Sequence, residues 1–391
     1  MNLVNFRNYE ALDLDLGPGT VLVQGDNGQG KSNLLESIYI LAIAKSPWAS
    51  SDRELVRRDT SQPVTYSRIA AVVRRTGDDL KLQIDLGNLG TEVPDLDGNP
   101  TIQKLIRVNG APRRAIDFVG QLSAVMFSAQ DLEVVFGPPA ARRRYLDILI
   151  SQFDRQYLGA LQRYQRVLSQ RNHLLKRLRD GSARTDELDV WNDQLVFEAK
   201  YVMARRVETV AGLSELSAVI HLELSGTGEQ LGLQYRPSAD LAAEGSEESL
   251  AEQLRGAMEA RRAREIAQGM TVCGPHRDDV EIRIDGLEAA PYASRGQART
   301  AILSLRLAEA QYLKYHRGQE PVLLLDDVLS ELDAARRLQV IQRASQYEQC
   351  FISTSDPATV AGPLLAHATR LTIHGGAAVK VDSEQADPAG E

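Results

Sequence analysis

The sequence has few cysteines, few aromatic residues and no long apolar run. Cys273 and Cys350 lie far apart, without the spacing of a metal site or of a disulfide framework, which is typical of a reducing compartment. No stretch approaches the roughly 18 apolar residues that a membrane-spanning helix needs. The first nine residues contain no apolar signal segment. We therefore expect a cytoplasmic protein that neither spans a membrane nor is secreted.

An excess of positive charge is also missing. The chain has 45 Lys and Arg against 53 Asp and Glu, a formal net charge of −8. This balance excludes a generally basic nucleic-acid coat, so any contact with DNA must come from a local basic patch. The length of 391 residues predicts two or three domains, and 43% hydrophobic residues are enough to form their cores.

A glycine-rich segment carries the strongest chemical signal. It follows a short buried run at Val21–Gln24 and opens a helix, which is where a phosphate-binding loop must lie. Its glycines leave backbone N–H groups free to surround phosphate oxygens. We expect Lys31 to reach the β- and γ-phosphates of ATP and Ser32 to ligate Mg²⁺. The predicted nucleotide-binding residues are Gly25, Asp26, Asn27, Gly28, Gln29, Gly30, Lys31, Ser32 and Asn33.

Two carboxylates follow a second apolar run, Val322–Leu325, which predicts a buried parallel strand. Ligands of α/β proteins bind at the carboxyl ends of such strands. Asp326 is therefore a candidate Mg²⁺ ligand, directly or through water, and Asp327 a candidate for orienting the attacking water. The alternative is a strand followed by an acidic helix cap.

Ser294, Gly296 and Gln297 precede a predicted helix from Ala298 to about Tyr315 and resemble the signature of ABC ATPases. Taken alone, this pattern is equally a helix N-cap. The order along the chain favours the ABC interpretation. The elements follow one another in the order typical of that class: the phosphate loop, Gln130, the signature, the carboxylate pair and a D-loop ending at Asp333.

The ABC resemblance implies a two-subunit site. In that class the signature completes the nucleotide site of a second subunit, which predicts an ATP-dependent homodimer around two ATP molecules. Ser294, Gly296, Gln297 and Asp333 would then contact the partner's nucleotide. Gln130 would help to hold Mg²⁺ and take part in catalysis. Ser355 occupies the position where transporter ATPases have a switch histidine.

Periodicity predicts an α/β head that is split in sequence by an α-helical insert. The ABC resemblance implies that this head is an ATPase head of the Rad50 and SMC type. Alternating and β-like patterns cover Leu12–Leu16 and Val64–Phe118, with a hairpin at Asn109–Gly110. Helical spacing begins near Arg142 and predicts a hairpin of two long helices and a third helix at about Glu248–Ala267. The predicted domains are 1–141 (head), 142–268 (helical insert), 269–381 (head) and 382–391 (disordered acidic tail). A surface loop is predicted at Gly87–Pro100.

Within the ABC class, nearly the whole chain resembles the RecF family of bacterial recombination-repair ATPases. The matching segments are Asn5–Tyr9, Asp26–Glu36, Asp131–Asp147, Gln170–Asn172, Gly274–Asp279, Ser294–Gln297 and Asp326–Asp333. The resemblance implies that Arg7 contacts the nucleotide. It also implies ATP-dependent binding to gapped DNA, slow ATP hydrolysis, and cooperation with RecR and RecO in placing RecA at single-strand gaps. The protein would then be associated with the nucleoid. Arg295 and Gln130 depart from residues common in relatives, and Ser355 departs from the switch histidine of transporter ATPases.

Two features leave alternatives open. The stretch Arg155–Arg179 has seven Lys and Arg and no acidic residue, so it is either a DNA-phosphate contact or a solvated helix face. In Gly274–Asp279, aspartates could stabilise a turn, or His276 and Arg277 could face nucleotide or DNA.

Other protein classes fit the sequence less well. An SMC or Rad50 protein needs hundreds of residues between its head halves, and a transporter subunit does not need the 263 residues between Lys31 and Ser294. A small-molecule kinase needs neither signature nor D-loop. An ATP-gated clamp or scaffold with a protein partner remains the main alternative.

Overall fold

The structure is a computed structural model that describes residues 1–58, 66–75, 77–87, 102–238, 246–360 and 367–381. Most of the predicted Gly87–Pro100 loop and the whole predicted tail 382–391 lie outside these residues. The chain forms two compact units, one of 1–129 with 313–391 and one of 130–312. The second unit encloses the predicted insert 142–268 and extends beyond it at both ends.

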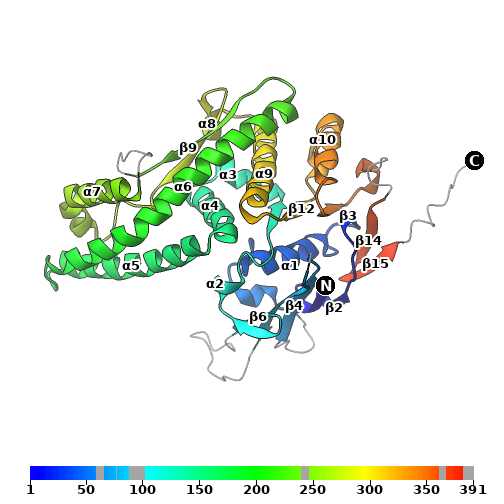
Figure 1. The fold of residues 1–391 in the computed structure, drawn as a ribbon, viewed down its shortest axis with the longest axis horizontal. Helices are drawn as coiled ribbons and strands as arrows, with labels where there is room; N and C mark the ends of the chain where they lie inside the picture. Colours follow the sequence, from blue (N-terminus) through cyan, green and yellow to red (C-terminus); the bar gives the residue numbers. More distant parts are fainter. Residues whose placement is uncertain (59–65, 76, 88–101, 239–245, 361–366, 382–391) are drawn as a thin grey trace, which may run out of the picture. The chain divides into compact units, whose positions relative to one another are not determined.

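The first unit contains a sheet built from both ends of the chain. Its described strands lie in the order β15-β14-β3-β13-β12-β8, and all adjacent pairs are parallel except β14 with β15. The strands are β3 (Gly19–Gln24), β8 (Ala124–Phe127), β12 (Val322–Asp326), β13 (Gln349–Thr354), β14 (Thr369–His374) and β15 (Ala377–Val381). The N-terminal β3 lies between two C-terminal strands (Figure 1). The predicted split α/β fold is therefore confirmed.

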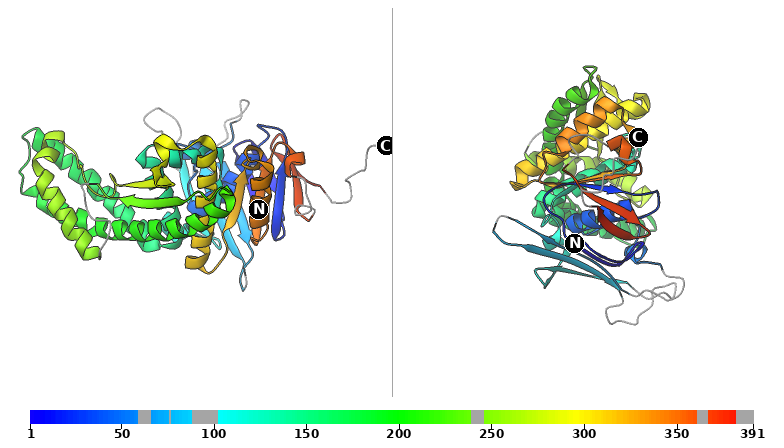
Figure 2. Two further views of the ribbon diagram at one scale, coloured as in Figure 1. Left: turned by 90° about the horizontal axis from the view of Figure 1, so that it is seen from above. Right: turned by 90° about the vertical axis from the view of Figure 1, so that its right-hand side faces the viewer.

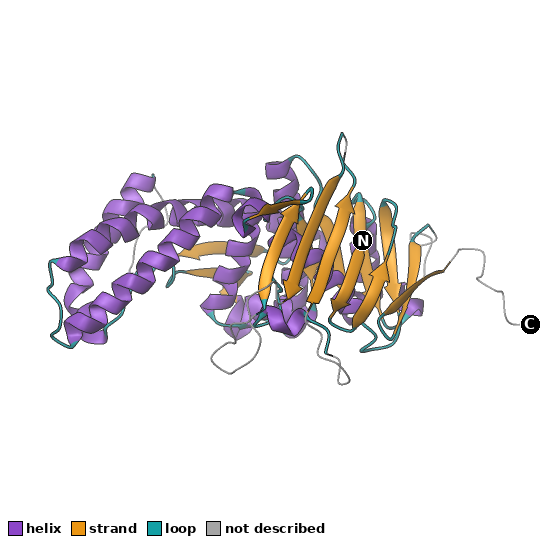
Figure 3. Ribbon diagram, turned by 90° about the horizontal axis from the view of Figure 1, so that it is seen from below, coloured by secondary structure: helices purple, strands orange, loops and turns teal. Residues whose placement is uncertain are grey.

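A second, antiparallel sheet completes this unit (Figure 3). Its order is β2-β1-β4-β5-β6-β7, from β1 (Asn2–Phe6), β2 (Tyr9–Asp13), β4 (Tyr66–Val73), β5 (Leu80–Gly87), β6 (Gln103–Val108) and β7 (Ala111–Arg113). Asn109 and Gly110 have φ of 50° and 79° between β6 and β7. Both angles suit a two-residue hairpin turn of the predicted type. Short helices η1 (Asp52–Leu55) and α2 (Ala115–Phe118) accompany the sheet.

Helix α1 (Lys31–Ile43) contacts both sheets, β8, β12 and β13 on one side and β4 and β5 on the other. Almost every residue from Leu34 to Ala42 is buried, as expected for a helix that is apolar on all faces. This burial fixes the position of the helix start, where Lys31 and Ser32 lie.

The second unit is largely helical (Figure 2). Its elements are η2 (Ala129–Asp131), α3 (Leu132–Phe136), α4 (Pro139–Phe153), α5 (Arg155–Arg179), α6 (Glu187–Ser225), β9 (Leu231–Arg236), α7 (Glu247–Gln268), β10 (Asp279–Ile284), β11 (Leu287–Glu288), α8 (Ala289–Tyr292) and the start of α9 (Arg295–Arg317). The predicted hairpin is α5 with α6, and the predicted third helix is α7. No helix among the described residues is long and apolar enough to cross a membrane.

The predicted insert is not helical throughout. Strand β9 lies within 142–268 and pairs antiparallel with β10, from Leu231 opposite Ile284 to Arg236 opposite Asp279. Leu231 and Tyr235 are buried on one face, so the local period is two and not 3.6. The long helical patterns on either side had hidden this short strand.

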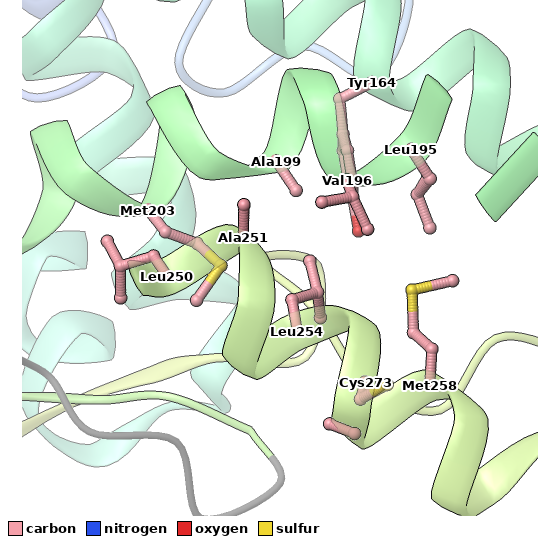
Figure 4. Packing of buried hydrophobic residues seen from close by; sticks show 11 residues of the cluster. Tyr164, Leu195, Val196, Ala199, Met203, Leu250, Ala251, Leu254, Met258 and Cys273 are labelled. Carbon is pink, nitrogen blue, oxygen red and sulfur yellow. The ribbon is translucent and has the colours of Figure 1, made fainter. Parts of the chain in front are cut away.

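Helices α5, α6 and α7 share one apolar core (Figure 4). Tyr164 from α5 and Cys273 from the loop after α7 join a cluster with residues of α6 and α7. The remaining members are Leu195, Val196, Ala199, Met203, Leu250, Ala251, Leu254, Ala257 and Met258. The cluster holds the third helix against the hairpin.

Arg171, which interrupts the apolar face of α5, is 1% exposed and donates three side-chain hydrogen bonds. It donates to Glu265 Oε2 at 2.6 Å, to Thr271 Oγ1 at 2.7 Å and to Asn192 Oδ1 at 2.8 Å. Glu265 is completely buried. One guanidinium therefore joins α5, α6 and α7, and removing it would leave a buried carboxylate without its cation.

We predict that Arg171→Ala lowers the free energy of unfolding of the helical unit by about 3–5 kcal/mol. Urea unfolding followed by Trp191 fluorescence, in a Trp48→Phe background, measures this value. Arg166→Ala, at an exposed position of the same helix, is the control and should change stability by less than about 0.5 kcal/mol. A loss below about 1 kcal/mol for Arg171→Ala would contradict the role of the buried pair.

Candidate functional site

The glycine-rich loop joins β3 to α1, and its glycines hold conformations closed to other residues. Gly25, Gly28 and Gly30 have φ of 146°, 78° and 117°. A Cβ on Gly25 would collide with the carbonyl oxygen of Ile373, and one on Gly30 would lie 2.6 Å from Asn8 Nδ2. The loop tip, Asp26 to Gly28, is exposed. The backbone thus forms an open cradle at a helix N-terminus, a site suited to phosphate.

Lys31 is 6% exposed, and its ammonium group lies inside this loop. Its Nζ donates to the carbonyl oxygens of Gly25 at 2.7 Å and Asp26 at 2.9 Å. The cation is therefore already held where an entering phosphate would meet it. A phosphate oxygen would replace neutral carbonyl partners by a charged one.

The loop is supported by two turns, Arg7–Asn8 between β1 and β2 and Gly375–Gly376 between β14 and β15. Sequence reasoning assigned Arg7 to the site, but not Asn8, Tyr9 or the second turn. Asn8 Nδ2 donates to Gln29 O at 2.7 Å, and Asn33 Nδ2 donates to Asn8 Oδ1 at 2.8 Å. The buried Tyr9 hydroxyl donates to Gly30 O at 2.8 Å. From the β14–β15 turn, the amides of Gly375 and Gly376 donate to Gln29 Oε1 and Gln29 O, at 2.7 and 3.2 Å. The only sequence signal for this second support is the Gly-Gly turn.

The two predicted carboxylates lie at the end of β12. Asp326 Oδ1 accepts from Ser32 Oγ at 2.9 Å and from Ser353 Oγ at 2.7 Å. Burial raises the pKa of the Asp326 carboxyl above its usual value, although both hydroxyl contacts oppose the shift. A hydroxyl beside a carboxylate is a hard oxygen set of the kind that Mg²⁺ prefers. The donor set therefore fits the predicted metal.

Asp327 has a left-handed backbone, with φ of 54°. Its amide donates to Ser353 Oγ at 3.0 Å, and its Oδ1 is buried without a hydrogen-bond partner among the described residues. An unsatisfied carboxylate oxygen in a strained position is costly, and such features concentrate at functional sites. This arrangement suits the predicted contact with water.

The remaining predicted residues of this edge follow neighbouring strands. Phe127, Asp326 and Thr354 end the parallel strands β8, β12 and β13. Ser355 comes directly after Thr354 and is half-buried, and Gln130 follows Phe127 by three residues and is exposed.

Arg7 was predicted to contact nucleotide, yet its guanidinium is bound within the first unit. It donates to both oxygens of the buried Glu36, at 2.9 and 2.7 Å, and to Glu54 O at 3.1 Å. The pair fixes the β1–β2 turn to α1. Arg7 also lines an open hollow of about 520 Å³ together with Asn8, Asn33, Glu54, Val56, Arg57 and Arg58.

The signature residues form a reciprocal cap at the start of α9. Gln297 N donates to Ser294 Oγ at 3.1 Å, and Ser294 N donates to Gln297 Oε1 at 2.9 Å. Gln297 Nε2 also donates to Glu229 Oε1 at 2.8 Å. Ser294, Arg295 and Gly296 remain exposed. The helix N-terminus is thus rigid and open to an anion, so the N-cap geometry and the signature role are compatible.

Asp333 caps another helix, α10 (Ala334–Ala344), by accepting from Arg336 N at 2.9 Å. Its carboxylate lies on the surface. It also pairs with Arg336 Nη1 at 3.3 Å. The contact of Asp333 with a partner's nucleotide stays a prediction.

The Gly274–Asp279 segment is a turn held by its own polar side chains, apart from Arg277, which is exposed. His276 points inward, with Nδ1 2.6 Å from Tyr164 Oη and Nε2 3.2 Å from Thr271 O. Burial lowers the pKa of His276 to about 4, so the imidazole is neutral at neutral pH. Asp279 forms a bidentate pair with Arg142 at 2.7 and 2.8 Å. The turn interpretation accounts for His276.

The basic side chains of helix α5 fall into two groups, those that are buried or form ion pairs and those that are exposed. Arg171 is buried, and Arg163 pairs with Glu198 at 2.6 Å while remaining 51% exposed. Arg166 and Arg177 are exposed and donate to the carbonyl oxygens of Gln162 and Ser182. These two side chains are the best candidates for contact with phosphates.

Over nearly its full length, the chain is similar to proteins that all carry the same name. Residues 1–368 match the model of the RecF/RecN/SMC N terminal domain. The DNA replication and repair protein RecF of Chloroflexus aurantiacus is 41% identical over 96% of this chain and 97% of that one. RecF of Staphylococcus carnosus is 35% identical over 97% and 99%.

Solved structures agree with these relatives. A structure described as the recombination mediator protein RecF-ATP in the RecFOR pathway has a TM-score of 0.86 at 31% identity, covering 97% of this chain and 96% of that one. The Smc head of Pyrococcus furiosus has a TM-score of 0.53 at 16% identity, covering 98% and 96%. The second likeness bears on the fold alone. Together they confirm the predicted ABC-type head with its helical region.

We predict that Tyr9→Phe weakens the affinity for ATP about fivefold, because Gly30 O loses a hydrogen bond worth about 1 kcal/mol. Equilibrium titration with a fluorescent ATP analogue measures the change. Tyr66→Phe is a matched control, because Tyr66 Oη donates to Asp85 on the antiparallel sheet at 2.7 Å. Equal affinities for Tyr9→Phe and the unaltered chain would show that this support does not shape the loop.

Proposed function

The chain belongs to the RecF family of the RecF/RecN/SMC proteins, and from that premise we propose an ATP-switched DNA-binding protein of replication and recombinational repair. The observation that carries this proposal is the glycine loop, with Lys31 held inside it and Ser32 bonded to Asp326. These groups supply a phosphate cradle, a cation and a hard oxygen pair within one unit. The relatives' names and the ATP-bound structure support the same assignment.

In this proposal the glycine loop holds the phosphates of ATP. Lys31 neutralises the β- and γ-phosphates, and Asn33 and Arg7 complete the nucleotide contacts on the α1 side. Ser32, Asp326 and Gln130 would hold Mg²⁺, which supplies positive charge to the phosphate oxygens. Asp327 accepts a proton or a hydrogen bond from the attacking water, and Gln130 and Ser355 orient that water.

The second part of the proposal is an ATP-dependent homodimer. Ser294, Gly296 and Gln297 present an open helix N-terminus, whose partial positive charge complements the γ-phosphate of ATP bound to another copy. Asp333 lies at the same composite site. Hydrolysis removes the γ-phosphate and with it this contact, so slow turnover acts as the switch that releases the dimer.

The third part concerns partners. We propose that the dimer binds gapped DNA, single-stranded and double-stranded, and works with RecR, and with RecO, in placing RecA on it. The support is the relatives' naming in DNA repair and in the RecFOR pathway. We propose that the protein acts in the cytoplasm, at the nucleoid. An ATP-gated clamp with a protein partner is the second candidate, since the net charge of −8 limits any DNA surface to local patches.

We predict that binding to a labelled gapped duplex needs ATP·Mg²⁺. The Lys31→Ala variant should lose this ATP-dependent DNA binding. Without Lys31 the ATP affinity should fall at least about tenfold, because a charge-assisted contact to phosphate is lost. Fluorescence anisotropy measures DNA binding, and Lys45→Ala, at an exposed position just after α1, is the control. If ATP drives dimer formation while DNA binding never appears, the protein-partner candidate replaces the DNA proposal.

We further predict that Arg166→Glu with Arg177→Glu weakens DNA binding equally for unrelated sequences. Each lost phosphate contact should reduce the slope of log affinity against log salt by about one. Arg370→Glu with Lys380→Glu, on β14 and β15, changes the net charge equally and is the control. An unchanged salt slope in the α5 variant would assign this helix face to solvent.

A further inference from the structure

The segment that leads into the signature exposes apolar side chains to solvent. Leu287 is 60% exposed and Tyr292 is 71% exposed. Pro291, between them in sequence, is exposed as well. Single exposed apolar residues are common, but three within six residues, immediately before a predicted ligand contact, form a local concentration. Exposed apolar surface of this kind marks contacts with another molecule.

The same segment is held rigidly. Strand β11 pairs with β10, and Ala289 at the start of α8 is 1% exposed. In the turn between the two strands, Asp285 N donates to Gln230 O at 2.9 Å and Gln230 N donates to Asp285 Oδ1 at 2.8 Å. The exposed side chains are therefore displayed by a fixed backbone, which lowers the entropy cost of binding through them.

Positive charge accompanies this apolar surface. Arg295 is exposed and makes no ion pair with any residue that the structure describes. It lies next to Ser294 at the open N-terminus of α9, where the helix dipole adds partial positive charge. The complementary surface must combine an apolar area with negative charge. A nucleotide bound to the exposed phosphate loop of a second copy offers both, since a base and ribose adjoin a triphosphate.

We propose that Leu287, Tyr292 and Arg295 form a contact surface for a second copy of this chain, on which Tyr292 closes over the ATP bound by that copy. This inference rests on the proposed ATP-dependent dimer and adds to it a residue that the signature motif does not contain. Tyr292 suits the role because an aromatic ring buries a large area with few rotatable bonds.

The first test compares dimer affinity in the presence of a nonhydrolysable ATP analogue, by sedimentation velocity. Tyr292→Ala should weaken the dimer about tenfold or more, as expected for an aromatic residue central to an interface. Tyr292→Phe keeps the ring and should retain most of the affinity. Tyr315→Ala is the matched control, because Tyr315 is 83% exposed on α9. The affinity of the monomer for the analogue should be equal in all four chains.

The second test asks whether Tyr292 acts across the dimer. Tyr292→Ala and Lys31→Ala chains are mixed in equal amounts. A mixed dimer has one intact composite site, made of the Tyr292→Ala chain's phosphate loop and the Lys31→Ala chain's Tyr292. With random pairing, ATP turnover should rise to about a quarter of that of the unaltered protein. Mixing Tyr292→Ala with a chain that carries both substitutions creates no intact site and should give no rise.

The outcomes separate this inference from the proposed function. If the unaltered chain stays monomeric with the ATP analogue, the proposed dimer itself is wrong. If the unaltered chain dimerises and Tyr292→Ala dimerises equally well, only the Tyr292 inference is overturned. It is also overturned if Tyr292→Ala loses activity but the mixture shows no recovery, because Tyr292 then acts within its own chain.

Discussion

The hydrogen bonds that Ser32 and Ser353 donate to Asp326 are the constraint on which the site depends. They join α1, β12 and β13. Ser32 and Asp326 are 294 residues apart in the sequence. Their geometry requires β3, β13 and β12 to lie side by side in one parallel sheet, which they do. This unit is formed by two separate segments of the chain. They can build one site because both contribute strands to the same edge of the sheet.

The helical unit uses buried charge in a comparable way. Arg171 bonds with Glu265, and Arg206, which is 2% exposed, donates to Asp147 Oδ1 at 2.7 Å and to Pro275 O at 2.6 Å. Such pairs are weak sources of net stability, because both ions lose their hydration. Their directional bonds join α5, α6 and α7 in the first case and α4 and α6 in the second. The Gly274–Asp279 turn lies in this polar network, which accounts for its particular sequence.

Sequence reasoning succeeded where local chemistry and chain order carry the information. The glycine loop, the hairpin at Asn109–Gly110 and the three long helices follow from motif and period alone. It could not find contacts between residues that lie far apart in the chain. Nothing near Arg7 reveals that Glu36 occupies its guanidinium, and nothing near Tyr9 reveals the bond to Gly30. Strand β9 was missed because six residues of period two, between two long helices, carry too weak a signal.

Several groups of the proposed site have no partner among the residues that the structure describes. Asp327 Oδ1 is buried and unsatisfied, and Tyr292 and Arg295 face solvent from a rigid segment. The buried Asp327 oxygen and the exposed Tyr292 ring are costs that a ligand or a second copy would remove, so both groups favour assembly. Thermodynamic linkage then makes the effects of ATP binding and dimer formation on each other reciprocal. If the two ATP molecules strengthen the dimer by some factor, dimer formation must strengthen the binding of the two ATP molecules taken together by the same factor. Loss of the γ-phosphate weakens both together, which lets a slow hydrolysis step control release.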